Sequence, residues 1–244
     1  MADSLNTRTA LVTGGSGVIG SAICSRLAEH GFHVLVHGHR NASRATDLAQ
    51  TIVDQGGSAE AVCFDVTDRS ACAEVLQPIA QAAPVQVIVH NAGIHGDAPL
   101  AGMSGEQWDS VVDVSLNGFY NVVQPLLLHM IGTRWGRIIS MSSVAAILGN
   151  RGQANYAAAK AGLHGATRAL AVEVASRGIT ANVVVPGIIE SEMASGFSPE
   201  QIAAMVPMKR AGRPQEVAAL VGFLASDEAS YVSGQIIGAN GGMI

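Results

Sequence analysis

Seven short apolar segments recur along the chain, and longer segments of mixed polarity separate them. Most of the short segments are nearly continuous apolar runs, rich in Val and Ile, without a regular alternation of apolar and polar positions. Such runs are typical of parallel strands that are covered on both faces. We therefore predict seven parallel strands, at 9–13, 33–37, 60–64, 85–90, 137–142, 180–185 and 234–239.

The longer segments have the length of helices, and strand and helix alternate along the whole chain. We predict helices at 18–30, 43–55, 68–82, 104–131, 154–177 and 214–226. This alternation favours an α/β fold of the Rossmann type, a doubly wound sheet of about seven parallel strands with helices on both faces. No linker-like segment interrupts the pattern, so we expect residues 1–244 to form a single domain.

The segments that directly follow the strands predict where ligands bind. In a sheet of this kind, ligands lie beyond the carboxyl ends of the strands. Polar residues and glycines gather there, in "GGSGVIG", "NAG", "SSV" and "PGIIESEM". The irregular connection 188–213 follows the sixth strand, and connections of this length in compact domains are usually functional lids.

Composition adds a prediction about assembly and excludes several functions. Hydrophobic residues make up 48% of the 244 residues and charged residues 14%, which predicts surface buried between subunits. The net charge of −5 offers no basic surface to nucleic acid, and no apolar run has the length of a membrane span. The chain shows no signal peptide and no cysteine–histidine set at metal-ligand spacing. We expect a cytoplasmic protein with reduced thiols and no metal.

The segment "TGGSGVIG", residues 13–20, joins the first predicted strand to the first predicted helix. Gly15, Gly17 and Gly20 match the pattern GxGxxG, in which amides at a helix start face a pyrophosphate. The second strand ends in "HGHRN", with Arg40 in place of the acidic residue that binds the ribose of NAD. A guanidinium there would pair with the 2′-phosphate of NADPH. The alternatives are an ordinary glycine-rich turn and a solvated arginine.

Tyr156 and Lys160 lie four residues apart in "NYAAAKAG" and therefore share one face of a predicted helix. An ammonium group near a phenol favours phenolate, so we expect Lys160 to lower the pKa of Tyr156. A tyrosine with a lowered pKa can donate and accept protons near neutral pH. Ser142 and Ser143 follow the fifth strand, where a hydroxyl could bond a substrate oxygen.

These motifs, in this order and spacing, resemble the short-chain dehydrogenase/reductases over essentially the whole chain. Within that family, the segment 149–193 and the ending "NGGM" resemble the 3-oxoacyl-[acyl-carrier-protein] reductases. The segments "NAGIHGDAPLAGMS" and "VSLNGFYNV" resemble the ketoreductases of aryl polyene clusters.

The resemblance implies roles for individual residues. Tyr156 would protonate the substrate carbonyl oxygen as hydride arrives from the nicotinamide, and Ser143 would hydrogen-bond that oxygen. Lys160 would hold the nicotinamide ribose and tune Tyr156. The segment 191–210 would be the substrate lid, in which Met193, Met205 and Met208 would line an acyl pocket or pack against the core. The residues implied in NADPH binding are Gly14, Ser16, Gly17, Val18, Ile19, Arg40, Asn41, Asp65, Val66, Asn91, Ala92, Gly93, Tyr156, Lys160, Pro186, Gly187 and Ile189.

Two positions depart from the family pattern. Val18 replaces a loop glycine, so we expect Gly17 to make the close approach to the cofactor and Val18 to have an ordinary helical or extended backbone. In the family, an arginine at the position of Gly17 often binds the 2′-phosphate as well. Because glycine lacks this side chain, Arg40 would bind the 2′-phosphate with less support. Ser115 replaces an asparagine that holds a water leading to Lys160, and its hydroxyl would hold that water more weakly.

The sequence thus predicts an NADPH-dependent enzyme that reduces a 3-oxoacyl thioester on an acyl carrier protein to the 3-hydroxyacyl form, in fatty acid or aryl polyene biosynthesis. Arg134 and Arg177 match carrier-docking positions of such reductases, or are helix-end arginines that meet the helix dipole. The resemblance also implies a homotetramer. The alternative functions are a reductase of a free sugar, polyol or secondary alcohol, and a non-catalytic cofactor-binding partner.

Overall fold

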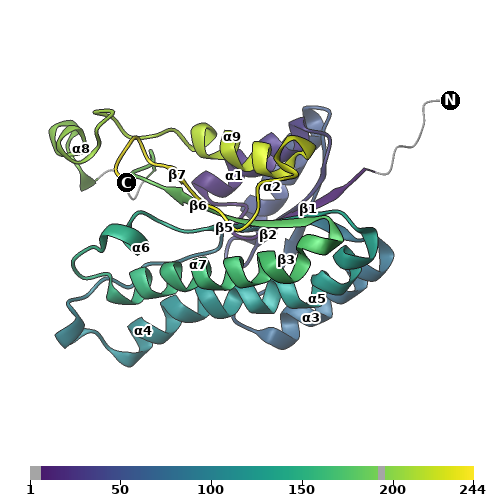
Figure 1. The fold of residues 1–244 in the computed structure, drawn as a ribbon, viewed down its shortest axis with the longest axis horizontal. Coiled ribbons are helices and arrows are strands. Elements are labelled where there is room, and N and C mark those ends of the chain that lie inside the picture. Colours follow the sequence, from purple (N-terminus) through teal and green to yellow (C-terminus); the bar gives the residue numbers. More distant parts are fainter. Residues whose placement is uncertain (1–6, 192–195) are drawn as a thin grey trace.

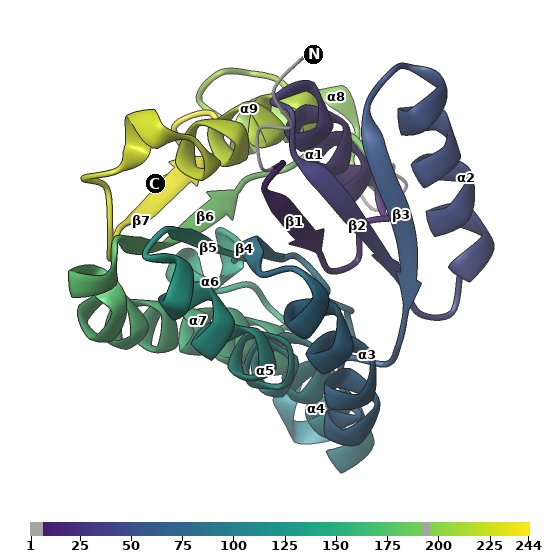
Figure 2. The same ribbon diagram turned by 90° about the vertical axis from the view of Figure 1, so that its right-hand side faces the viewer.

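The computed structural model describes residues 7–191 and 196–244, and its centre is one parallel sheet of seven strands. The strand order is β3-β2-β1-β4-β5-β6-β7, with β3 and β7 at the two edges (Figure 2). All seven predicted strands are confirmed, with ends that differ by two residues at most. Their bounds are β1 Thr9–Val12, β2 His33–Gly38, β3 Ser58–Cys63, β4 Val85–His90, β5 Gly136–Met141, β6 Ile179–Pro186 and β7 Ile236–Ala239.

Helices cover both faces of the sheet, which confirms the doubly wound α/β fold (Figure 1). One face packs against α1 (Val18–Glu29), α2 (Ala42–Asp54) and α9 (Pro214–Ala225). The other face packs against α3 (Arg69–Ala82), α5 (Gly118–Thr133) and α7 (Ala154–Val174). The central strands β1, β5 and β6 are buried at every position, because helices exclude water from both of their sides.

The shorter helices lie in the connections between these elements. They are α4 (Gly105–Val112), α6 (Ala145–Leu148) and α8 (Pro199–Met205), with 3₁₀ turns at Leu100–Gly102, Ala175–Arg177 and Asp227–Ala229. Helix α8 lies within the predicted lid, and its start is fixed by a capping box in which Ser198 accepts from the amide of Gln201. Helix α6, directly after β5, was not predicted. No helix in the described part of the chain is long and apolar enough to cross a membrane.

The single helix predicted over 104–131 is wrong in one respect. The chain forms α4 and α5 with a π-helical turn, Asp113–Asn117, between them. The turn accommodates an extra residue within a continuous apolar pattern, so the pattern of the sequence does not reveal it. Ser115 lies in this turn and is buried. The predicted helix over 154–177 also ends earlier, at Val174, and continues as a 3₁₀ turn.

A cluster of aromatic and charged side chains connects elements near the amino ends of the strands. The carboxylate of Asp227 accepts a hydrogen bond from the indole of Trp135 at 2.7 Å and pairs with Arg8 at 3.2 Å. Two guanidinium groups contact the Trp135 ring, that of Arg8 at 3.8 Å and that of the buried Arg137 at 4.2 Å from the ring centre. Asp227 therefore links the segment before β1 to β5 and to the end of α9.

We expect Asp227→Asn to lower the free energy of unfolding by about 1–2 kcal/mol at pH 7, because Arg137 loses its carboxylate partner. The bonds from Trp135 and Arg8 lower the pKa of Asp227 in the folded protein. The carboxylate therefore stabilises the fold above its unfolded pKa, near 3.9, and this contribution is lost as the pH falls through the folded pKa. Urea denaturation at pH 7 and in acid measures the difference.

The matched control is Asp54→Asn, at an exposed carboxylate on α2, which should leave stability within about 0.5 kcal/mol. The interpretation of the cluster is contradicted if Asp227→Asn matches this control at pH 7, or if its deficit persists in acid where both proteins carry a neutral side chain.

Candidate active site

A cavity of about 1490 Å³ opens along the carboxyl ends of the strands, where the sequence predicts the ligand site. It extends from the loop between β1 and α1, past the ends of β4 and β5, to the segments after β6. Every residue that the resemblance implies in NADPH binding lines this cavity, and so does Ser143. Three of the predicted site residues, Ser115, Arg134 and Arg177, are not among its lining residues.

The glycines between β1 and α1 have different structural tasks. Gly14 has a φ of +61°, a left-handed conformation that favours glycine. A Cβ atom at Gly20 would overlap the carbonyl oxygen of Gly14, so no side chain fits there. Gly17 has a φ of −78° and ψ of 170°, an extended backbone that any residue can adopt. Val18 begins α1 with a helical backbone, as predicted.

The start of α1 provides the features that a bound phosphate requires. Its N-cap residue, Gly17, makes no side-chain capping bond, and no acidic residue occupies the first turn. The residues at this helix start, Val18, Ile19 and Gly20, line the cavity. Free amides and the positive end of the helix dipole favour an anion at this place. The loop therefore fits the pyrophosphate of a dinucleotide.

His37, near the end of β2, connects this loop to the segment after β3 through both of its ring nitrogens. Its Nδ1 accepts the amide of Gly14 at 3.0 Å, and its Nε2 donates to the carbonyl of Phe64 at 2.9 Å. Burial lowers the pKa of His37 to about 4, so the imidazole is neutral and can perform both tasks at once. A histidine at a strand end gives no signal in the sequence that separates this task from ordinary packing.

Asn91 ties the same loop to β4. Its Nδ2 donates to the carbonyls of Thr13 and Gly14, both at 3.1 Å. The hydroxyl of Thr13 accepts the amides of Asn91 and Ala92, both at 3.0 Å. The "NAG" motif therefore holds the glycine loop in position as well as lining the cavity.

A second arginine lies beside Arg40, contrary to the expectation that Arg40 stands more alone. Arg44 lies in the first turn of α2, four residues after Arg40, and both line the cavity. Both side chains are exposed, and neither has an ion-pair partner within the described ranges 7–191 and 196–244. The spacing of four residues could have suggested Arg44, but it lies beyond the "HGHRN" segment that the sequence analysis considered.

Tyr156, Lys160 and Ser143 meet in the cavity, with Tyr156 in the first turn of α7. The expected direction of the Tyr156 pKa is wrong: burial of the phenol raises it, against a smaller lowering by the hydrogen bond with the Ser143 hydroxyl. Lys160 Nζ lies 5.8 Å from the centre of the Tyr156 ring and donates to the carbonyl of Met141 at 3.0 Å. Burial is therefore the largest effect on the phenol, and Lys160 is not among the groups that shift its pKa. Burial also lowers the pKa of Lys160 to about 8.

The two serines after β5 have separate tasks. Ser142 donates to the carbonyl of Lys160 at 3.1 Å and bonds His164 Nε2 at 2.7 Å, so its hydroxyl is engaged by α7. Ser143 accepts the amide of Ala145 at 3.2 Å and keeps its own proton available to the cavity. Ser143 is therefore the hydroxyl that can bind a substrate oxygen beside Tyr156.

Comparison with known proteins identifies the family of the chain. A family model described as enoyl-(acyl carrier protein) reductase matches residues 15–244. The chain is 42% identical to the 3-oxoacyl-[acyl-carrier-protein] reductase FabG of Aggregatibacter actinomycetemcomitans, over 97% of this chain and 99% of that protein. It is 43% identical to the protein of the same name from Escherichia coli K12, over 97% of each. The chain belongs to the short-chain dehydrogenase/reductase family.

A solved structure agrees with this assignment at the level of the fold. The crystal structure of an Agrobacterium tumefaciens protein described as a gluconate dehydrogenase superposes with a TM-score of 0.93. The two chains are 36% identical, over 97% of this chain and 95% of the other. The relatives of this chain therefore include proteins named for a carrier-bound substrate and one named for a free sugar acid.

Ser115, where the resemblance implies an asparagine in other short-chain dehydrogenase/reductases, is buried and close to Lys160. Its Oγ has no hydrogen-bond partner within the described residues. A Cβ atom at Gly93 would lie 3.0 Å from Lys160 Nζ and 3.7 Å from Ser115 Oγ, so both groups face the same narrow space. The carbonyl of Ser115 accepts Nε2 of the buried His90 at 2.8 Å, which fixes the π-helical turn. An unpartnered buried hydroxyl at this place fits a site for one water molecule.

Arg134 and Arg177 lie near the amino ends of the strands, whereas the cavity opens at the carboxyl ends. Arg134 directly precedes β5 and Arg177 precedes β6, so both are at amino ends of strands. The structure brings the two regions together, because Arg134 Nη2 donates to the carbonyl of Ser176 at 3.3 Å. Arg134 has a left-handed backbone at the end of α5, with a φ of +54°.

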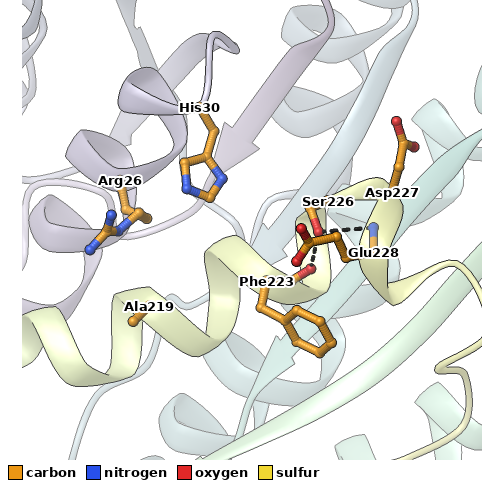
Figure 3. Close-up of a pocket in the computed structure, with 7 residues that line it drawn as sticks. All are labelled: Arg26, His30, Ala219, Phe223, Ser226, Asp227 and Glu228. Carbon is orange, nitrogen blue, oxygen red and sulfur yellow. Dashed lines mark hydrogen bonds between the residues drawn. The ribbon is translucent and has the colours of Figure 1, made fainter.

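Another cavity, of about 510 Å³, lies between α1 and α9 (Figure 3). Its polar groups bond one another: Ser226 donates to the carbonyl of Phe223 at 2.7 Å and accepts the amide of Glu228 at 3.2 Å. It contains none of the predicted site residues. No group of three His, Cys, Asp or Glu side chains that could hold a metal ion occurs in the part of the chain that the structure describes.

Proposed function

We propose that the protein uses NADPH to reduce a 3-oxoacyl thioester on an acyl carrier protein to the 3-hydroxyacyl thioester. The observation on which this depends is that Tyr156, Lys160 and Ser143 line one cavity, in which burial raises the pKa of the Tyr156 phenol. A protonated phenol is a proton donor at neutral pH, which favours reduction of a carbonyl. Relatives that are 42–43% identical over almost their whole length are named for this reaction.

The cavity fits a nicotinamide dinucleotide along its length. Gly14, Gly17 and the amides at the start of α1 would hold the pyrophosphate, and Arg40 with Arg44 would hold the 2′-phosphate. Asp65 and Val66 would contact the adenine. The nicotinamide half would be lined by Asn91, Ala92, Gly93, Pro186, Gly187 and Ile189. Other parts of the dinucleotide would contact Ser16, Ile19 and Asn41. When bound, this cofactor supplies the hydride.

The chain's own residues then bind the carbonyl and move one proton. The hydroxyls of Ser143 and Tyr156 donate hydrogen bonds to the carbonyl oxygen, which orients it and stabilises its developing negative charge. Tyr156 transfers its proton to that oxygen as the carbon is reduced. Lys160, charged beside the phenolate that forms, stabilises it and holds the ribose. Ser115 would hold the water through which the proton of Tyr156 is replaced.

Apolar side chains that line the cavity support an acyl substrate. They include Leu148, Phe197, Met205 and Met243. Phe197 and Met205 belong to the proposed lid, residues 191–210, while Met193 lies outside the described residues and Met208 is exposed and not among the lining residues. Thioethers and an aromatic ring can adapt to a long or conjugated acyl chain, which fits fatty acid or aryl polyene biosynthesis in the cytoplasm.

Reduction of a free sugar, polyol or secondary alcohol is the second candidate, favoured by the solved relative described as a gluconate dehydrogenase. Turnover of an acetoacetyl thioester, measured as NADPH oxidation, is compared with turnover of gluconate, polyols and secondary alcohols. Higher kcat/KM for the thioester supports the proposal, and preference for a free alcohol supports the second candidate. Absence of turnover with every substrate, in protein that binds NADPH, would support a non-catalytic cofactor-binding partner.

The proposed homotetramer is supported by apolar side chains on the outer layer of helices. Leu128 on α5 is 76% exposed and Val172 on α7 is 82% exposed, which is unfavourable in a monomer. Because Arg134 and Arg177 face away from the cavity of their own chain, a carrier protein bound there would deliver its substrate to another subunit.

We expect the double variant Arg134→Ala/Arg177→Ala to raise KM for a carrier-bound substrate about 10-fold, because each exposed arginine contributes about 0.5–1 kcal/mol to an acidic partner. KM for a small acetoacetyl thioester and kcat for both substrates should stay within about two-fold. Arg26→Ala, on α1 where Arg26 pairs with Glu29, is the matched control. Equal losses with the small and the carrier-bound substrate would contradict docking at these arginines.

A further inference from the structure

His95 lies against the ring of Tyr156, in a position that neither the motifs nor the comparisons single out. The two ring centres are 4.5 Å apart and their planes differ by 23°, which is a stacked arrangement. Both side chains line the large cavity. The imidazole therefore covers one face of the phenol, on the chain segment between β4 and α4.

The segment that bears His95 is fixed to the start of α7 by three hydrogen bonds on consecutive residues. Asn155 Nδ2 donates to the carbonyl of Gly96 at 3.0 Å, and Gln153 Nε2 donates to the carboxylate of Asp97 at 2.9 Å. The amide of Ala98 donates to the carbonyl of Gly152 at 2.9 Å. These bonds attach the segment to the residues that precede Tyr156, so the stack is a fixed feature and not the chance position of a loop side chain.

The groups around the stack keep the imidazole neutral. Burial and the charge of Lys160 lower the pKa of His95, and the carboxylate of Asp97, 3.9 Å from its Nδ1, opposes them. Asp97 also raises the pKa of Tyr156, in addition to the larger effect of burial. A neutral imidazole adds no charge to the phenol and contributes packing and exclusion of water.

We propose that His95 is a positioning residue that orients the ring of Tyr156 toward Ser143 and shields the phenol from water. This inference rests on the proposed function only in taking Tyr156 as the proton donor. Stacking restricts rotation of the Tyr156 ring about its side-chain bonds, so the hydroxyl stays directed at the place where a carbonyl oxygen binds. Shielding keeps the phenol protonated to higher pH, because water would stabilise the phenolate.

The test compares His95→Ala with His95→Phe, which restores an aromatic ring without the imidazole nitrogens. For reduction of an acetoacetyl thioester by NADPH, we expect His95→Ala to lower kcat about 10-fold and to change KM less than about two-fold. The loss of activity at alkaline pH, which follows deprotonation of Tyr156, should move to lower pH in His95→Ala. His95→Phe should restore most of kcat and return the alkaline limb to that of the wild type.

His33→Ala is the matched control, because the His33 side chain is exposed to the same extent, 30%, and pairs with Glu60 away from the cavity. It should leave both kcat and the pH profile unchanged. Melting temperature and NADPH titration establish that each variant folds and binds cofactor. If His95→Ala does not fold, His95→Leu takes its place as the variant that lacks a ring.

Three results would overturn the inference. They are wild-type kcat in the ringless variant, a loss of kcat without a shift of the alkaline limb, and a His95→Phe variant as impaired as His95→Ala. Failure of the proposed function is recognised separately, because Tyr156→Phe would then retain activity or the thioester would not be turned over by the wild type. If only a free alcohol is a substrate, the same variants are compared with that substrate.

Discussion

Tyr156→Phe is expected to lower kcat/KM for reduction of an acetoacetyl thioester by about 1000-fold, with NADPH affinity changed less than about three-fold. General acid catalysis by a positioned side chain contributes about 100- to 10,000-fold, and phenylalanine removes the only atom of Tyr156 that can donate the proton. The ring still fills its place against His95, so the cavity keeps its shape. Initial rates of NADPH oxidation and a fluorescence titration of the cofactor measure the two quantities.

The pH dependence of the wild type gives the same prediction a second measurement. Burial raises the pKa of Tyr156, so the phenol remains protonated throughout the neutral range and reduction is retained there. Reduction should begin to fall near pH 8, as Lys160 loses the charge that stabilises the phenolate, and should be lost as the pH rises further through the raised pKa of Tyr156. Tyr231→Phe, at a fully exposed tyrosine, should behave as the wild type. Tyr156→Phe with more than about a tenth of wild-type activity would exclude Tyr156 as the proton donor.

The double variant Arg40→Ala/Arg44→Ala is expected to lower kcat/KM for NADPH about 30-fold and to leave that for NADH within about three-fold. A charge-assisted hydrogen bond is worth about 1.5–3 kcal/mol, and the exposure of both side chains reduces this through solvent and salt. The selectivity changes because only NADPH has the 2′-phosphate that these side chains would bind. Steady-state kinetics with both cofactors, at low and at high salt, provide the measurement.

The single variants divide this effect between the two side chains. Arg44→Ala alone should lower kcat/KM for NADPH several-fold, since Arg44 is the second arginine on the same side of the cavity. Arg26→Ala serves as the control for the loss of a positive charge elsewhere on the surface. Equal losses with NADPH and NADH would show that the arginines support the loop and not the phosphate, and the proposed cofactor preference would then be wrong.

The sequence pattern alone identifies residues whose role depends on their neighbours along the chain. Val and Ile runs specify buried strands, and all seven lie where predicted. Glycines between a strand and a helix specify a phosphate-binding loop, although the two indispensable ones are Gly14 and Gly20, through a left-handed φ and a close backbone contact. Tyr156 and Lys160 are brought together by helical spacing, which also requires no knowledge of the fold.

The residues missed by pattern are those whose task depends on distant partners. His37 supports the glycine loop from β2, and His95 stacks on a tyrosine 61 positions later in the chain. The π-helical turn at Ser115 is invisible in an apolar pattern that suits one continuous helix. The wrong direction for the pKa of Tyr156 has the same origin, because the position of Lys160 is apparent from spacing but the burial of the phenol is not.

The sequence by itself determined the alternation of strands and helices, the carboxyl ends of the strands as the place where ligands bind, and the helical spacing of Tyr156 and Lys160. These follow from short-range periodicity and from the rule that parallel strands end at one edge. Only the tertiary structure showed that burial raises the pKa of the phenol, that Arg44 lines the cavity with Arg40, that His95 stacks on Tyr156, and that Arg134 and Arg177 lie near the amino ends of strands, away from the cavity. Desolvation and contacts between distant segments arise when the chain packs, and no local pattern of residues encodes them.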